Sequence, residues 1–490
     1  MTDATATAAL LAQARAAQAG WAALPVAARL AGIARLRRAI AAEGAALADA
    51  IGPRPGRSLA DTVACEIIPL ADAARVLERR AGRLLAPHPL GRRGRPWWLA
   101  GCSAELRREP LGLILVIGPA NYPLFIPGVQ LLQGLAAGNA VALKPGAGGR
   151  AVLAALVALA ERSGIPGALM PLLPETPAAA EAAIAAGVDK VILTARRRPA
   201  RRVLAALAPG LTPAVMELSG NDAVIVLPGA DLELVAGAIA YGLRLNGGAT
   251  CIAPRRIFVP AADQGPLAAR IDERLARVAP VPLEPGLARR LSGLLAAAVA
   301  EGARLVRGTL PLGASTGPLL LTGADPASPL LREGAFAPLA CLVPVGSTAE
   351  ALAGAAQSPY ALGAAVFGPA GEARAVAGAL KAGLVTVNDL IVPSADPRLP
   401  FGGRGRSGFG TTRGAEGLLE MTALKVVTAR SGRFRPHYRP VRDADGPLFL
   451  AALAATHGGG AGARLRALAD LLRAAAGRRR PAAVAAADPP

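Results

Sequence analysis

The chain has 490 residues, of which 53% are hydrophobic and 18% charged, a balance typical of globular proteins that excludes an intrinsically disordered chain. Its length exceeds what one hydrophobic core usually holds, so we expect two or three lobes. No apolar run approaches the roughly 20 residues that a membrane span needs. The composition therefore excludes a transmembrane helix and favours a multi-lobed α/β or helical protein.

The formal net charge of +20 would suit a nucleic-acid binder, yet only four of the 54 cations are lysine and the arginines are spread along the whole chain. That distribution favours drift in composition over a nucleic-acid surface. The start, MTDATATAALLAQARAAQAG, lacks the basic segment ahead of an apolar core that marks a signal peptide. We therefore expect a cytoplasmic, reducing location in which free thiols persist.

Helical spacing of apolar residues predicts several helices over residues 5–86, interrupted by the two glycines and two prolines of 52–56. LGLILVIGP at 111–119 is a continuous apolar run closed by Gly-Pro, which is typical of a buried parallel strand. Similar strands are expected at 140–146, 190–195 and 222–229. Strands that alternate with helices predict an open α/β sheet, whose ligands bind beyond the carboxyl ends of the strands.

A second α/β block is expected at about 220–409, with strands at RIFVP, ACLVPV, GAAVFG and LVTVN. From about residue 431 the chain becomes rich in Arg, Pro and Ala around one predicted helix at 461–476. The densest cationic cluster, RFRPHYRPVR with the final AAAGRRRPAA, has two interpretations: a solvated tail, which we favour, or a site for an acidic partner.

Residues able to carry chemistry follow the predicted strands. Asn121 follows the end of the first, and Lys144 lies at the end of the second. Glu217 precedes a small-residue turn, and Cys251 lies 34 residues further on in NGGATCIAPRR. An amide, an amine, a carboxylate and a thiol can serve as oxyanion donor, cofactor anchor, general base and nucleophile in acyl chemistry. Taken singly, each has an ordinary interpretation, such as a turn asparagine or an inert buried thiol. The four cysteines are too widely spread to indicate disulfides or a metal site, so no metal is expected.

Several long stretches resemble the aldehyde dehydrogenase superfamily over about residues 20–430. They are, in order, REPLGLILVIGPANYPL, LAAGNAVALKP, MELSGNDAVIVLPGADLE, NGGATCIAPRRIFV, FAPLACLVPV, VTVND and LPFGGRGRSGFGTTRGAEGLLEMTALKVV. The resemblance implies an α/β, aldehyde-dehydrogenase-like fold with a Rossmann-type cofactor domain, an α/β catalytic domain and a small oligomerisation arm. The domains expected are a cofactor-binding domain at 1–90 and 109–217, a catalytic domain at 218–409, an oligomerisation arm at 91–108 and 420–432, and a C-terminal tail at 433–490.

The resemblance also implies a mechanism. Cys251 would attack an aldehyde as a thiolate, and the Asn121 side chain with the Cys251 backbone N–H would hold the oxyanion. Hydride would pass to NAD or NADP, and Glu217 would deprotonate the water that hydrolyses the thioester to a carboxylic acid. Further implied roles are binding of adenosine ribose by Lys144, of nicotinamide ribose by Glu333, of the cofactor by Arg196 and Phe336, and lining of the substrate pocket by Tyr122, Phe125, Asn388 and Phe401. An apolar pocket favours medium or long aliphatic or aromatic aldehydes. A homodimer or homotetramer is expected, with Trp97-Trp98 as interface anchor or ordinary packing.

The departures from the family pattern concentrate at the cofactor. Ala147 stands where the common family motif KPSE has its acidic residue, and Ala195 and Arg196 replace the Gly and Ser of the family's pyrophosphate turn. Glu333 lies one position before the place where the family usually has its glutamate. Loss of the acid and gain of an arginine predict that NADP is accepted at least comparably to NAD. In the alternative interpretation Arg196 only begins an exposed helix. The glycine-rich FGGRGRSGFG does not join a strand to a helix and is therefore expected on the substrate side.

Other functions remain open. The same thioester could serve CoA-acylating or reductive chemistry, although a base at Glu217 favours water. The altered turn at 194–200 would also fit a catalytically weak paralogue that acts as a binding or scaffold protein, and a basic nucleic-acid binder is the most distant alternative.

Overall fold

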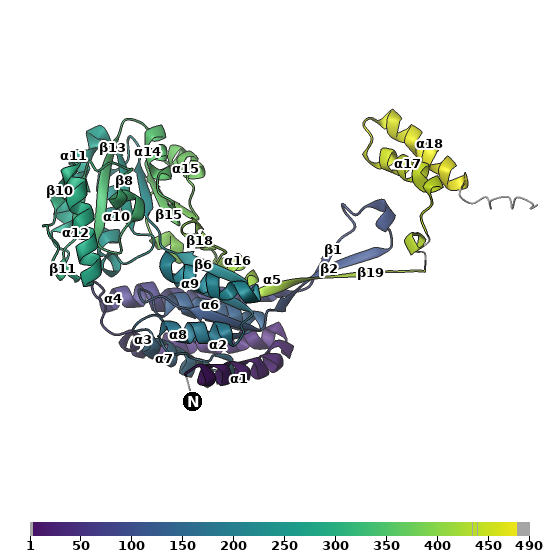
Figure 1. The fold of residues 1–490 in the computed structure, drawn as a ribbon, viewed down its shortest axis with the longest axis horizontal. Helices are drawn as coiled ribbons and strands as arrows, with labels where there is room; N and C mark the ends of the chain where they lie inside the picture. Colours follow the sequence, from purple (N-terminus) through teal and green to yellow (C-terminus); the bar gives the residue numbers. More distant parts are fainter. Residues whose placement is uncertain (1–2, 434, 439, 478–490) are drawn as a thin grey trace, which may run out of the picture. The chain divides into compact units, whose positions relative to one another are not determined.

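The computed structural model of this chain describes residues 3–433, 435–438 and 440–477. Contacts within the chain divide it into two compact units: a larger one, Met1–Pro89 with Glu105–Val427, and a smaller one, Leu90–Ala104 with Thr428–Pro490. Figure 1 gives the elements of each unit. The domain boundaries expected from the sequence stay a prediction, and the RRRPAA of the predicted tail lies outside the described residues.

The N-terminal part of the larger unit is helical, as the apolar spacing predicted. Its helices are α1 (Asp3–Ala23), α2 (Val26–Ala42), α3 (Gly44–Ile51), α4 (Leu59–Thr62) and α5 (Ile68–Leu85). The predicted interruption at 52–56 is confirmed, since α3 ends at Gly52 with a φ of 71°, a conformation that favours glycine. A short π-helical stretch, Val63–Ile67, joins α4 to α5 and directs Glu66 into the interior.

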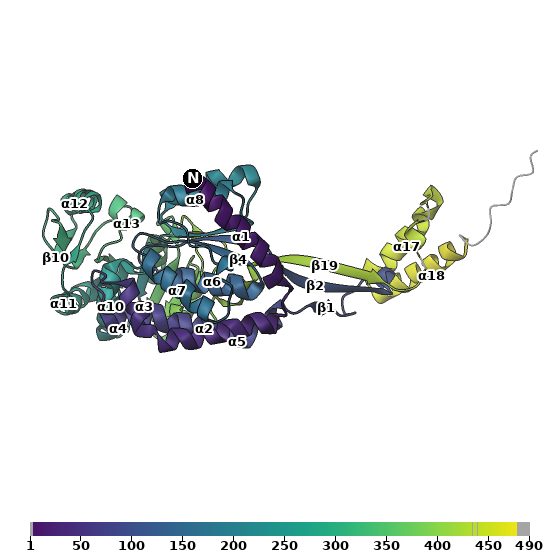
Figure 2. The ribbon, with the colours of Figure 1, turned by 90° about the horizontal axis from the view of Figure 1, so that it is seen from below.

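The first sheet has the strand order β18-β6-β5-β3-β4, in which β3 to β6 are parallel and β18 is antiparallel to β6. The strands are β3 (Leu113–Ile117), β4 (Ala140–Lys144), β5 (Lys190–Ala195), β6 (Ala214–Leu218) and β18 (Gly408–Phe409). Figure 2 shows the layers: α1, α8 (Pro177–Ala185) and α9 (Arg197–Leu207) cover one face, and α6 (Phe125–Ala137) and α7 (Arg150–Arg162) cover the other, with α2 and α5 outside them. All residues of β3 and β4 are buried, which explains their unbroken apolar runs.

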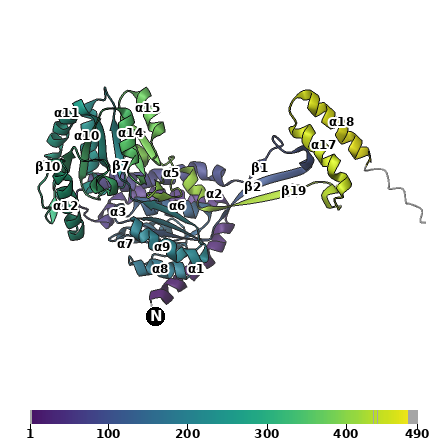
Figure 3. The same ribbon diagram turned by 45° about the horizontal axis from the view of Figure 1, so that its top comes forward.

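A second sheet has the order β10-β12-β13-β8-β7-β15-β16, parallel except for β10. Its strands are β7 (Asp222–Val226), β8 (Pro254–Pro260), β10 (Arg304–Arg307), β12 (Leu319–Thr322), β13 (Leu339–Val345), β15 (Gly363–Phe367) and β16 (Leu384–Val387). Figure 3 shows α10 (Leu232–Arg244) beside α11 (Gln264–Leu275); these cover one face, whereas α12 (Pro285–Ala300), α13 (Pro329–Glu333), α14 (Thr348–Ala356) and α15 (Ala370–Ala379) pack on the other. The strands predicted for this block are confirmed.

Shorter elements complete the larger unit, namely the strand pairs β9 (Val281–Pro282) with β11 (Ser315–Thr316) and β14 (Tyr360–Ala361) with β17 (Arg404–Gly405), and helix α16 (Gly414–Leu419). A third sheet has the order β1 (His88–Leu90), β2 (Cys102–Pro110), β19 (Thr422–Arg430). In the smaller unit α17 (Gly446–His457) packs along α18 (Ala461–Gly477), which confirms the helix predicted at 461–476. Among the described residues, no helix is both long and apolar enough to cross a membrane.

The order of the first sheet determines where a ligand can enter it. β3 lies between β4 and β5, so the chain leaves β3 toward one edge of the sheet and later returns to its other side. Such a reversal leaves a crevice beyond the carboxyl ends of the central strands, the usual ligand site of open α/β sheets.

Candidate active site

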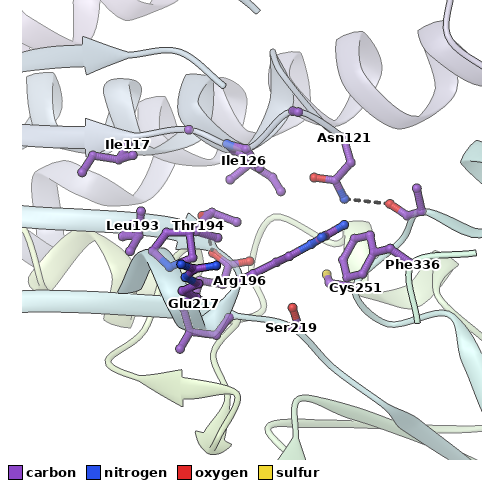
Figure 4. Close-up of a pocket in the computed structure, with 18 of the residues that line it drawn as sticks. Ile117, Asn121, Ile126, Leu193, Thr194, Arg196, Glu217, Ser219, Cys251 and Phe336 are labelled. Carbon is purple, nitrogen blue, oxygen red and sulfur yellow. Dashed lines mark hydrogen bonds between the residues drawn. The ribbon is translucent and has the colours of Figure 1, made fainter. Parts of the chain in front are cut away.

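A cavity of about 920 Å³ opens beyond the carboxyl ends of β3, β4, β5 and β6. It is large enough for a dinucleotide or a drug-sized ligand. Six of the residues predicted from the sequence line it: Asn121, Lys144, Arg196, Glu217, Cys251 and Phe336. Figure 4 shows Asn121, Glu217, Cys251 and Phe336 gathered at this cavity. The structure thus brings the thiol, the carboxylate and the amide to one space.

The loop before Cys251 explains the NGG of the sequence. Asn246, Gly247 and Gly248 follow one another with positive φ values of 53°, 59° and 71°, a run that β-branched or bulky residues would resist. A Cβ on Gly248 would lie 2.6 Å from the Cα of Pro338. The turn therefore needs these residue types to hold Cys251 at the cavity.

The surroundings of Cys251 disfavour its charged form. Burial raises the pKa of the thiol, and the nearby carboxyl groups of Glu217 and Asp222 raise it further, while the Arg413 guanidinium opposes them. The side chain is half-buried, so a substrate can still reach the sulfur. Because the thiolate is the nucleophile, its formation requires a neighbouring proton acceptor or a gain of positive charge.

Glu217 supplies such an acceptor from the end of β6. It is 5% exposed, and it accepts hydrogen bonds from the hydroxyls of Thr412 (3.2 Å) and Thr194 (3.4 Å). Burial raises its pKa, whereas the Arg413 charge and the two hydroxyls lower it. A carboxylate with a raised pKa is a stronger base than an exposed one, which suits proton abstraction from water or from a thiol.

Asn121 is held in place on both sides. Its side-chain Nδ2 donates to the carbonyl of Ala249 over 2.8 Å, shown as the dashed line in Figure 4, which leaves the second N–H of the amide for another acceptor. The Asn121 carbonyl accepts from the Arg57 guanidinium at 2.8 Å and from Asn246 at 3.1 Å. The amide thus lies beside the Cys251 loop with one donor free for an oxyanion.

A buried ion pair fixes the same loop from behind. Arg57 and Glu66 pair at 2.5 Å with both side chains fully buried. The second carboxylate oxygen of Glu66 accepts the backbone N–H groups of Leu124 and Phe125 at the start of α6, at 3.0 and 2.8 Å. One pair therefore contacts the backbone carbonyl of Asn121 and the helix that follows it. Each charge offsets the other, although the Arg57 Nε has no hydrogen-bond partner.

The same cavity also carries several cations on its lining. Lys144 ends β4, and burial lowers its pKa while Glu175 opposes the shift. The Arg196 guanidinium lies 5.7 Å from the centre of the Phe336 ring. Further cations on the lining are Arg54, Arg198 and Arg202. Such a set of donors fits an anionic ligand with phosphate groups.

The turn after Lys144, where the sequence departs from the family pattern at Ala147, is held by an acid from another loop. The carboxylate of Glu175 accepts the N–H groups of Gly148 and Arg150 at 2.9 and 2.7 Å, and these backbone bonds hold its pKa below the usual range. An acid from the neighbouring loop thus secures the turn that contains Ala147. Ala147 is itself absent from the cavity lining, whose acids among the described residues are Glu181, Glu217 and Glu284.

The structure places the other predicted site residues outside the lining. Glu333 ends α13 half-exposed and pairs with Arg290. Asn388, with a φ of 53°, uses both ends of its amide on the backbone of Gly368. These two side chains are therefore engaged elsewhere than at the cavity.

The predicted pocket aromatics lie behind the cavity. The Tyr122 hydroxyl bonds Thr250 over 2.7 Å, next to Cys251, and Phe401 packs in a small cluster that Cys251 borders. The Arg413 guanidinium lies 4.2 Å from the centre of the Phe401 ring and 5.6 Å from that of Phe125. These rings form a second layer beside the nucleophile. FGGRGRSGFG also stays off the lining, where its strand β18 pairs with β6 beside Glu217.

Sequence reasoning missed several residues of this site: Arg57, Glu66, Thr194, Thr412 and Arg413. Thr412 and Arg413 lie within a stretch that matched the family, yet nothing in their spacing indicated a partner 195 residues away. Glu66 lies in a helical run where a carboxylate normally faces solvent. A charged residue on an expected buried face was the one signal available.

Comparisons with known proteins agree with this geometry. The family model described as "Aldehyde dehydrogenase family" matches residues 1–427. The chain is 30% identical over 423 residues to 4,4'-diapolycopene aldehyde oxidase from Methylomonas sp., covering 84% of this chain and 79% of the relative. It is 32% identical over 350 residues to an NADP(+) succinate-semialdehyde dehydrogenase from Deinococcus radiodurans, covering 68% and 73%. A crystal structure of aldehyde dehydrogenase C from Pseudomonas syringae with NAD+ and octanal superposes with a TM-score of 0.77 at 27% identity, covering 86% of this chain and 89% of that one.

The fold and the family match thus define a Rossmann-type oxidoreductase. The chain belongs to the aldehyde dehydrogenase family. The predicted family, α/β fold class and enzyme class are confirmed.

Proposed function

We propose that this enzyme oxidises an aldehyde to a carboxylic acid through a thioester on Cys251, with NAD or NADP as hydride acceptor. The observation that carries the proposal is one cavity whose lining includes Cys251, Glu217 and Asn121 together with Lys144 and Arg196. The nucleophile, the base and the oxyanion donor thereby share one cavity with the cations that would bind the phosphates of a nucleotide.

Each step of the reaction is assigned to particular residues of the chain. The Cys251 sulfur bonds to the aldehyde carbon, and the free N–H of Asn121 with the Cys251 backbone N–H stabilises the oxyanion. Glu217 holds the proton that the thiol or the attacking water gives up, and its threonine donors keep the carboxylate oriented. Once the former aldehyde carbon has lost its hydride, the adduct is a thioester, which water cleaves to release the acid and the free thiol. A base beside the sulfur supports hydrolysis over transfer to CoA.

The lining fits a nicotinamide dinucleotide. Lys144, Arg196, Arg198 and Arg202 offer cationic donors for its phosphates, and when bound it supplies the acceptor for the hydride that the substrate carbon loses. Ala147 brings no acid that would repel a 2′-phosphate. Both NAD and NADP are therefore accepted, in keeping with relatives and structures whose names carry NADP(+) and NAD+.

Apolar aldehydes are the proposed substrates. The cavity lining includes the apolar residues Ile117, Ile126 and Leu193. One relative is named for 4,4'-diapolycopene aldehyde, and a similar structure was solved with octanal. A homodimer or homotetramer and a cytoplasmic location stay predictions from the sequence. Light scattering on the purified enzyme measures the first.

The test is a turnover assay with octanal, in which NAD and NADP are compared through the absorbance of the reduced nicotinamide and the product is identified by mass spectrometry. We expect octanoic acid without CoA, and a peptide of Cys251 carrying the acyl mass when the reaction is quenched early. Acyl mass on another cysteine, or product only when CoA is added, would contradict the proposal.

A further inference from the structure

The smaller unit exposes far more apolar surface for its size than the larger unit. Of the twenty-four exposed large apolar side chains in the described part of the chain, eleven belong to it. The family match ends at residue 427, so the C-terminal segment of this unit lies beyond it. Nothing in the dehydrogenase mechanism uses this surface.

The helical hairpin of α17 and α18 has almost no core of its own. Its buried apolar residues are the alanines Ala451 and Ala467, whereas Phe449, Leu450 and Leu453 on α17 are 52%, 66% and 58% exposed. The sequence of α17, GPLFLAALAATH, is apolar on all sides of the helix. A helix of that kind is normally buried, so the hairpin calls for an occupant that covers it.

On α18 the apolar side chains form a stripe. Leu465, Leu468 and Leu472 stand at positions i, i+3 and i+7 and are 67%, 46% and 65% exposed. Arginines 464, 466 and 473 lie next to them along the helix. The same unit exposes Trp97, Trp98 and Tyr438, residues with an apolar ring and a polar edge.

Charge decides what the occupant can be. The described residues of the smaller unit contain ten arginines and three aspartates, a net charge of +7, and of these aspartates Asp445 is buried and Asp470 already pairs with Arg473. A second copy would bring a surface of the same sign against it. A nucleic acid would satisfy the arginines but leave the leucines in water. An anionic lipid surface offers phosphates to the arginines and acyl chains to the leucines.

We propose that the α17–α18 hairpin docks the enzyme on an anionic lipid surface, lying in the interface with its exposed leucines among the acyl chains and its arginines at the phosphates. Neither α17 nor α18, as described, is both long and apolar enough to span a bilayer, so they lie along the interface. The exposed tryptophans and tyrosine suit the headgroup level.

The experiment is co-sedimentation of the full-length enzyme with vesicles of phosphatidylcholine alone and of equal parts phosphatidylcholine and phosphatidylglycerol. We expect binding to the second kind that weakens as salt is added, because the arginine contribution is screened. Leu465→Ser with Leu468→Ser and Leu472→Ser lowers binding by roughly tenfold for each leucine that enters the acyl chains. The matched control, Leu10→Ser with Leu234→Ser and Val299→Ser, removes exposed apolar side chains from helices of the larger unit and leaves binding unchanged.

Two further measurements keep the proposal falsifiable. Circular dichroism and dehydrogenase turnover check that the leucine variant is folded, and Arg464→Gln with Arg466→Gln and Arg473→Gln gives a second variant that keeps the apolar stripe and loses roughly fivefold per arginine. Wild-type enzyme that stays in solution with anionic vesicles overturns the proposal. So does a leucine variant that binds as the wild type does. If light scattering shows fewer subunits for the leucine variant than for the wild type, the hairpin binds a second copy instead. If the enzyme is retained on DNA but does not bind vesicles, the hairpin binds nucleic acid instead.

Discussion

The reacting residues and the arginines of α9 at the cavity differ in burial. In the first group, the buried part, Glu217 is 5% exposed, and the side chains of the Arg57–Glu66 pair behind the lining are fully buried. In the second group, the cationic part, arginines from the start of α9 present their charge to solvent-accessible space. Burial in the first group raises the pKa values of Cys251 and Glu217.

This difference separates chemistry from binding. A reacting group gains from a water-poor setting, because charges and dipoles act more strongly there and proton affinities can be shifted. Phosphate recognition needs only cations within reach, and each contact is screened and partly replaceable. Changes at the buried part are therefore expected to cost far more activity than changes at the cationic part, and the predictions below test that order.

The largest effect is expected from Cys251→Ala. Without the sulfur no thioester forms, so aldehyde oxidation falls by at least about 10⁴-fold, while the affinity for the dinucleotide in calorimetry stays nearly unchanged. Cys65→Ala and Cys102→Ala serve as controls and retain turnover. Activity that survives in the Cys251 variant would remove this residue from the mechanism.

Glu217→Gln comes next. The amide cannot take the proton of the attacking water, so the thioester accumulates and steady-state turnover falls by about 10² to 10⁴-fold. Stopped-flow absorbance should show a burst of reduced cofactor followed by a slow phase, and mass spectrometry should find trapped acyl-enzyme. An unchanged steady-state rate would contradict the role of this base.

The buried ion pair behind Asn121 is tested by Glu66→Gln. The change leaves the Arg57 charge buried without its partner, so the free energy of unfolding should fall by about 3 to 5 kcal/mol in urea titrations. Glu43→Gln is the matched control, since its pair with Arg162 is about half exposed and should contribute less than about 1 kcal/mol. Equal losses in the two variants would show that burial does not distinguish these pairs.

At the cationic part, Ala147→Glu should weaken NADP use more than NAD use. A carboxylate near the ribose repels a 2′-phosphate, and a change of about 1.5 to 3 kcal/mol corresponds to roughly ten- to hundredfold in kcat/KM. Ala147→Gln controls for size without charge. If both variants lower NADP and NAD use alike, shape and not charge governs this pocket.

The smallest effect concerns pH. Hydrolysis of the thioester needs ionised Glu217, so the rate rises with pH through its pKa, which burial holds above the usual carboxyl range. Thr412→Val removes a hydroxyl that stabilises the carboxylate, which raises that pKa further and moves the acid limb of the kcat profile to higher pH by up to about one unit. Thr422→Val, a buried threonine bonded to the carbonyl of Leu419, is the control and leaves the limb in place. A shift to lower pH would show that Thr412 does not donate to Glu217.

Arg255 and Arg256 show where sequence patterns mislead. They follow the nucleophile motif and look like surface charges, yet both are buried and donate to backbone carbonyls, Arg255 to that of Gly248 in the Cys251 loop. Burial lowers the pKa of each to about 10. Apart from Gly248, the carbonyls that they contact lie 35 to 99 residues away in the sequence, so no local pattern could have indicated them.

The sequence by itself determined the buried strands, the NGG turn before Cys251, and the Asn, Lys, Glu and Cys that meet at the cavity. These features are local, because apolar runs, turn residues and strand ends follow from spacing along the chain. Only the tertiary structure decided which cations reach the cavity and that Glu333 and Asn388 both lie away from it. It also decided that Thr412 contacts Glu217 and that the Arg57–Glu66 pair lies behind Asn121. Those contacts join residues far apart in the chain, and hydrogen bonding and desolvation act on what is near in space.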